Sequence, residues 1–266
     1  MTYAASVADV IAVNVAVGHC LAATPLTADD DRAVRRVASG ESTVADEVAR
    51  AAHDVHVHAG ERRTTALRIA EIERDPWAYA GPFDLGHLER VQRHTFRDSA
   101  GRTTFLCEAD TSSLDMLRSV LDHMSHERPA LPSSDAVCDL AAEHWANLAY
   151  TSAAVGGDRR VERAFVQLYL RQAGWDLDWS RVDLGEVAAA RRIAISDDED
   201  RYCDYRWLSA ALRPGMVRFG QAVATDPLAF DDVCERAIEG FRRMSAAKRR
   251  GIDPRAYFVG ANQIEP

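Results

Sequence analysis

Lysine and cysteine are scarce in this 266-residue chain, and each scarcity excludes a class of protein. Lys248 is the only lysine, and 32 basic residues stand against 41 acidic ones, which gives a formal charge of −9. An acidic chain of this kind is not expected to bind nucleic acid or anionic membranes broadly, although a local basic pocket is still allowed. The five cysteines form no CxxC pair, which argues against a disulfide framework or a cysteine zinc site and favours reduced thiols in the cytoplasm.

Long hydrophobic runs are also missing. The apolar, alanine-rich stretch 1–24 has no positive segment and carries Asp9, Asn14 and His19. We therefore expect a packed helix there, rather than a secretory signal or a membrane span.

Helical periodicity dominates the chain, so the predicted fold class is mainly α. Thr27 before three aspartates predicts a helix start, and Gly40 predicts its end. The only strong β signal is a hairpin at 100–107. The pattern is typical of one domain with an N-terminal helical layer. Helices are predicted at about 43–72 (with a break allowed at Gly60), 85–96, 112–126, 134–150, 160–173, 183–194, 205–223 and 228–244.

The segment 148–163 carries the clearest chemical signal. Gly156 and Gly157 permit a tight turn, and Asp158, Arg159 and Arg160 then begin a helix. A helix N-terminus that follows glycines and lies beside arginines is a sound anion site. The alternative is an ordinary loop, in which the arginines are solvated or pair with nearby carboxylates.

Three segments in order resemble the Fic-domain (Fic/Doc, or Fido) family. They are FDLGHLERVQRHTF at 83–96, LAAEHWANL at 140–148 and RQAGWDLDWSRV at 171–182. The resemblance covers about 76–195 and implies a Fic-like helical bundle with a short β-hairpin flap near 100–106. It divides the chain into an N-terminal helical layer at 1–75, the Fic-like core at 76–195 and a C-terminal helical extension packed on the core at 196–266. Proteins of this family mostly transfer AMP from ATP to a hydroxyl of a target protein. Their loop, HPFx(D/E)GNGR, supplies a histidine base, an acidic Mg²⁺ ligand and an arginine that binds the phosphates.

This chain departs from that loop. Ser152 stands at the histidine position, Gly156 at the acidic position and Arg159 at a glycine, whereas Arg160 matches the phosphate-binding arginine. The resemblance thus implies a degenerate loop, in which an anion pocket remains and conventional AMP transfer is lost or replaced. The expected ligand is ATP or another small phosphorylated anion, and Mg²⁺ lacks its usual carboxylate. The catalytic candidates are Ser152, Asp158 and Arg160, and the phosphate-binding candidates are Gly156, Gly157, Arg159, Arg160 and Arg163.

Two further patterns give alternatives. The stretch from Thr43 to Glu47 resembles the inhibitory helix motif of some Fic proteins, which makes Glu47 a regulatory candidate, although it is also a common helix start. His53, His56 and His58 support a second hypothesis, a histidine-rich helical metalloprotein. A third hypothesis is a non-catalytic helical interaction module that binds a protein partner or forms an oligomer.

Overall fold

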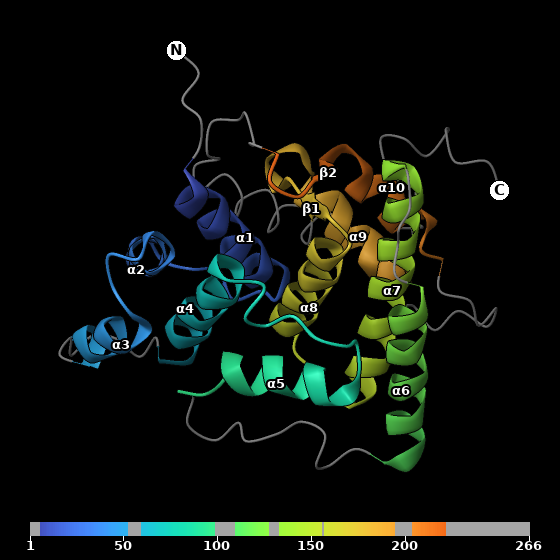
Figure 1. Cartoon of the computed structure of the whole chain (residues 1–266), viewed down its shortest axis with the longest axis horizontal. Helices are drawn as coiled ribbons and strands as arrows, with labels where there is room; N and C mark the ends of the chain where they lie inside the picture. Colours follow the sequence, from blue (N-terminus) through green and yellow to red (C-terminus); the bar gives the residue numbers. More distant parts are fainter. Residues whose placement is uncertain are drawn as a thin grey trace, which may run out of the picture.

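The fold is mainly α-helical, as the sequence predicts (Figure 1). A computed structural model describes residues 6–52, 60–98, 110–127, 133–155, 157–194 and 204–221. No helix in these ranges is long and apolar enough to cross a membrane. The helices are α1 (Val7–Leu21), α2 (Ala28–Ser39), α3 (Val44–Ala52), α4 (Gly60–Arg74), α5 (Leu85–Thr95), α6 (Thr111–His126), α7 (Ser134–Ala154), α8 (Arg159–Gln172), α9 (Leu184–Ala194) and α10 (Arg206–Leu212).

The N-terminal helices α1, α2 and α4 pack on one another around their own apolar cluster. Helix α2 begins where the sequence predicts, because Thr27 and Asp30 form a capping box, and it ends at Gly40 in a left-handed conformation. Helix α1 also contacts α8 and α9, and its Val17 and Leu21 belong to the main core. The N-terminal layer is therefore joined to the rest of the fold through α1 and α4.

Helix α8 lies at the centre of the described fold (Figure 1). Every residue from Arg160 to Arg171 is buried, and α1, α4, α5 and α7 all contact this helix. Its Phe165 and Tyr169 pack edge-on against Phe83, which precedes α5. A helix buried on all sides must find internal partners for each polar side chain it carries.

The described sheet is not the hairpin that the sequence indicates. Strand β1 (Trp175–Leu177) pairs antiparallel with β2 (Met216–Arg218), and Trp175 lies opposite Arg218. The predicted helix 205–223 is wrong beyond Leu212, because the chain turns through Arg213–Gly215, with Pro214 at its start, and then enters β2. The expected hairpin at 100–107 and helix at 228–244 lie outside the described residues.

The expected helix from 43 to 72 appears as two helices. Helix α3 ends at Ala52 and α4 begins at Gly60, and the residues between them lie outside the described ranges. In the C-terminal region, α10 packs on α7 and α9.

Candidate functional site

The candidate loop joins the end of α7 to the start of α8, and it is tightly closed. The backbone N–H of Gly157 donates to the carbonyl oxygen of Ser152 at 2.6 Å. A Cβ atom added to Gly157 would lie 2.5 Å from the Ser152 Cβ, so only glycine fits at this position. Gly156 lies outside the described residues.

Ser152 faces the interior of the protein. Its side chain is 2% exposed, and its hydroxyl donates to Oε1 of Glu162 at 2.5 Å. The other carboxylate oxygen of Glu162, Oε2, accepts from the guanidinium of Arg191. Ser152, which stands where Fic proteins carry their histidine base, therefore belongs to a buried network of polar contacts with Glu162 and Arg191.

Arg160 is held by carboxylates of the protein itself. Asp158 caps α8, and its two carboxylate oxygens accept from Nε of Arg160 at 2.9 Å and from Nη2 at 2.7 Å. The same Nη2 donates to Glu61 at 3.0 Å, and Nη1 donates to the Thr65 hydroxyl at 3.1 Å. Burial acts to lower the pKa of Arg160, but the hydrogen bonds and charges of Asp158 and Glu61 raise it above its usual value. The guanidinium is 4% exposed, and these contacts favour the alternative in which the loop arginines pair with carboxylates.

Arg163 lies one turn further on and points into the core. It is 1% exposed and donates to Glu73 at 2.7 Å. Glu73 also pairs with Arg171 at 2.5 Å and accepts from Asn14 at 3.2 Å. Burial acts to raise the pKa of Glu73, but the charges of Arg171 and Arg163 hold it below its usual value. The phosphate-binding role expected of Arg163 does not fit this position, because Glu73 is its anionic partner.

Arg159 is the loop arginine that faces solvent. Its Nη1 lies 3.4 Å from the carbonyl oxygen of Leu21. Partial burial and the positive charges of Arg191 and Arg192 lower the pKa of Arg159. Of the arginines that the sequence places in this loop, Arg159 is therefore the one whose side chain is exposed.

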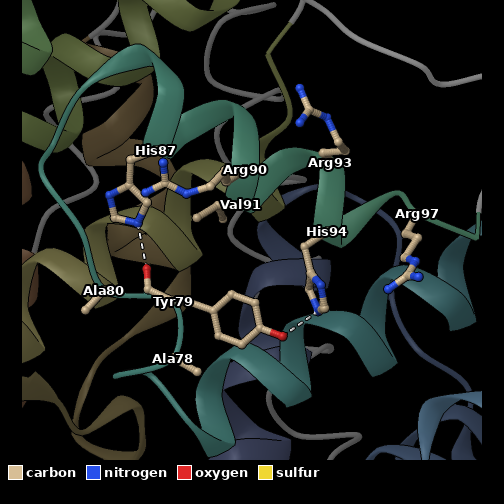
Figure 2. Close-up of a pocket in the computed structure, with 9 residues that line it drawn as sticks. All are labelled: Ala78, Tyr79, Ala80, His87, Arg90, Val91, Arg93, His94 and Arg97. Atoms are coloured by element: carbon tan, nitrogen blue, oxygen red, sulfur yellow. Dashed lines mark hydrogen bonds between the residues drawn. The ribbon is translucent and has the colours of Figure 1, made fainter.

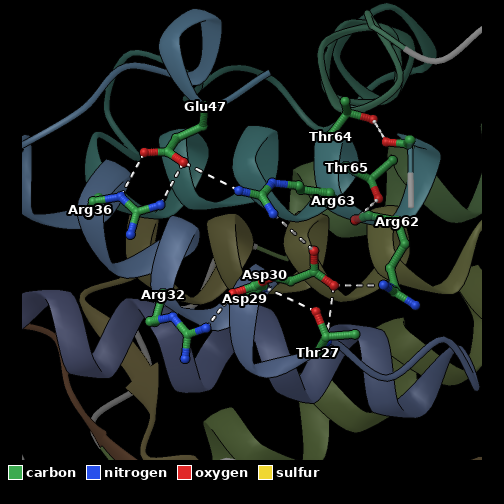
Figure 3. A network of polar contacts seen from close by, with 11 residues as sticks. Thr27, Asp29, Asp30, Arg32, Arg36, Glu47, Arg62, Arg63, Thr64 and Thr65 are labelled. Atoms are coloured by element: carbon green, nitrogen blue, oxygen red, sulfur yellow. Dashed lines mark hydrogen bonds and ion pairs between the residues drawn. The ribbon is translucent and has the colours of Figure 1, made fainter. Parts of the chain in front are cut away.

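Glu47, the regulatory candidate, contacts other arginines. Its carboxylate accepts from Nε and Nη2 of Arg36, each at 2.7 Å, and lies 3.4 Å from Arg63 (Figure 3). The Arg36 hydrogen bonds lower the pKa of Glu47 to about 2, against the effect of burial. Glu47 thus joins α2, α3 and α4, while the contact with Arg160 is made by Glu61.

The proposed metal ligands His53, His56 and His58 lie outside the described residues. Within the described ranges, no group of three or more histidine, cysteine, aspartate or glutamate residues is arranged to hold a metal ion.

Sequence reasoning did not assign a role to His19, which lies near the loop. This side chain is fully buried on α1, with Nδ1 3.2 Å from the Thr24 carbonyl oxygen. Burial and the charge of Arg160 lower the pKa of His19 to about 3. The helical pattern of the sequence does not indicate that His19 lies close to Arg160.

No protein-family model matches this chain, and neither does any curated protein. The resemblance to Fic proteins therefore rests on the three quoted segments and on the order in which they occur.

Proposed function

We propose that this chain is a diverged Fic-type bundle that has lost AMP transfer and acts as a binding protein. The observation that carries the proposal is the internal use of the loop's polar groups. The Ser152 hydroxyl donates to Glu162, and Arg160 is held between Asp158 and Glu61.

The chemistry of AMP transfer explains why these contacts matter. A target hydroxyl needs a base within hydrogen-bond reach, and the phosphates need Mg²⁺ and a free cationic group. Ser152 is buried, and loss of a general base alone costs about 10²–10⁴-fold in rate. The Asp158 carboxylate caps α8 and pairs with Arg160, so two internal contacts compete with any metal for it.

A specific observation supports anion binding as a second role of this loop. Arg159 is exposed, and the exposed Arg192 adds positive charge near it, whereas Arg191 pairs with Glu162. Arg160, in contrast, already has two carboxylate partners. Any anion bound at the start of α8 is therefore held mainly by Arg159.

A labelling assay tests the loss of transfer. The purified chain is incubated with Mg²⁺, a cell lysate and ATP labelled at the α-phosphate. We expect no protein-bound label above that of a heat-killed control. The variant Glu61→Gln removes one carboxylate from Arg160 and is also expected to give no label, because the base is still missing. Labelling that disappears in Arg160→Ala would contradict the proposal.

A further inference from the structure

A second basic region lies at α5 and the turn that follows it, and it shares no residue with the loop. An open cleft of about 430 Å³ runs along this helix, and the turn at residues 78–80 forms its other wall (Figure 2). Three arginines, two histidines, a tyrosine and small or branched apolar residues line the cleft, and none of the described residues that line it is a carboxylate. That volume falls in the range of sites for small molecules.

Tyr79 forms one wall of the cleft, and contacts at both its backbone and its side chain hold it in place. The carbonyl oxygen of Tyr79 lies 2.7 Å from Nε2 of His87, and the Tyr79 hydroxyl lies 3.0 Å from Nε2 of His94. Figure 2 shows the Tyr79 ring between these two histidines. The buried side chain of Val91 lies beneath the cleft. This wall is thus formed before any ligand binds, which lowers the entropy cost of binding.

The arginine edge of the cleft, formed by Arg90, Arg93 and Arg97, carries positive charge that the described residues neutralise only in part. Arg90, Arg93 and Arg97 are all exposed. Neither Arg90 nor Arg97 forms a side-chain hydrogen bond or ion pair with any residue that the structure describes, and Arg93 has only an exposed contact with Glu89 at 3.7 Å. Arg90 and Arg93 are three residues apart near the end of α5, and Arg97 follows two residues after the helix ends, so all three line the cleft from this end of α5 and the turn after it.

Two carboxylates near the cleft pair with a cation outside its lining. Glu71 lies 3.1 Å from Nε2 of His94, and Arg68 pairs with Glu71 at 2.7 Å and with Asp98 at 2.6 Å.

We propose that this cleft binds a small organic phosphate. The phosphate contacts the arginine edge, and an apolar or ring-shaped body lies against Tyr79 and Val91. Arginine guanidinium groups bind phosphate oxygens through paired, charge-assisted hydrogen bonds. The proposal goes beyond the loss of AMP transfer and does not depend on it, since the cleft and the α7–α8 loop share no residue.

Calorimetric titration tests the site with three probes at constant ionic strength. The probes are phenyl phosphate, inorganic phosphate and benzoate. Inorganic phosphate lacks the ring and benzoate lacks the phosphate, so the three affinities separate the contributions of the phosphate and of the ring. We expect saturable binding of phenyl phosphate that is tighter than the binding of the other two probes. In the double variant Arg90→Gln/Arg97→Gln, its affinity should fall about tenfold or more.

A control variant that loses the same charge distinguishes binding in the cleft from a general attraction of the anion to the positive charges of the protein. Arg32→Gln/Arg118→Gln removes two exposed arginines that pair with aspartates on their own helices. This control should bind phenyl phosphate like the wild type. Thermal unfolding checks that the variants remain folded. The proposal is overturned if the wild type shows no saturable binding, if inorganic phosphate binds as tightly as phenyl phosphate, or if the control loses as much affinity as the cleft variant.

Discussion

The arginines of α8 and those along α5 differ in what surrounds them. Arg160, Arg163 and Arg171 on α8 are buried, and each pairs with a carboxylate. Arg90 and Arg97 beside α5 are exposed and have no such partner in the described part of the chain. The comparison teaches that an arginine that already pairs with a carboxylate of the fold is less available to an external phosphate than an exposed arginine.

Helix α4 supplies those internal anions and acceptors. Glu61, Thr65 and Glu73 are spaced by multiples of four residues, so one face of α4 presents all three toward α8. A carboxylate fixed within the protein competes with a diffusing anion without the entropy cost of association. In this account the α8 arginines serve the fold, and the α5 arginines are available for binding.

Breaking the internal pairs should have the largest effect at Glu73. The variant Glu73→Gln leaves Arg163 and Arg171 buried without their shared carboxylate. Removal of one partner from a buried ion pair costs about 3–5 kcal/mol of unfolding free energy. Urea denaturation measures this loss. Glu89→Gln, an exposed carboxylate beside the α5 arginines, is the matched control and should change stability by less than about 0.5 kcal/mol. Equal stability of the two variants would contradict the structural role of the α8 arginines.

The two adjacent loop arginines should differ in the same assay. Arg160→Ala removes hydrogen bonds to Asp158, Glu61 and Thr65, and we expect it to lower the unfolding free energy by about 1.5–3 kcal/mol. Arg159→Ala removes an exposed side chain and should change it by less than about 0.5 kcal/mol. In titrations with inorganic phosphate, Arg159→Ala should lower the affinity of the loop more than Arg160→Ala does. A stable Arg160→Ala variant with weaker anion binding would restore the role that the family resemblance implies.

Restoring the family's histidine should harm the fold rather than create activity. Ser152→His places a larger ring where Gly157 already lies against the serine side chain. Overpacking of this kind costs about 1–3 kcal/mol. The labelling assay should show no AMP transfer, since the metal ligand is still absent. Strong transfer by a fully stable variant would show that the base was the only missing group.

The sequence predicts the helices well where local chemistry decides them. The start of α2 at Thr27 and its end at Gly40 depend on capping residues that are adjacent in the chain. The partners of Arg160 do not follow from such patterns, because Thr65 and Glu61 lie 95 and 99 residues away. Strands β1 and β2 are three residues each, too short for an alternating pattern to reveal.

A pH dependence of stability is also expected, and it involves His19. Its folded pKa of about 3 lies below its usual value of 6.5, because burial and then Arg160 disfavour the charged form. A lowered folded pKa stabilises the protein above pH 6.5, and this stability is lost as the pH falls from 6.5 toward 3. His19→Gln should therefore flatten the fall in urea midpoint between pH 7 and pH 5. If the urea midpoint of the variant falls with pH as steeply as that of the wild type, the result would contradict the buried, uncharged state of His19.

Hydrogen exchange at the arginine side chains, measured by NMR, tests the central comparison most directly. The Nε–H groups of Arg160 and Arg171 donate to Asp158 and Asp176, and that of Arg163 is buried. We predict slow exchange for these three and fast exchange for Arg90 and Arg97 in the same sample. Fast exchange at Arg160 would contradict the account, because that guanidinium would then be free to bind a phosphate.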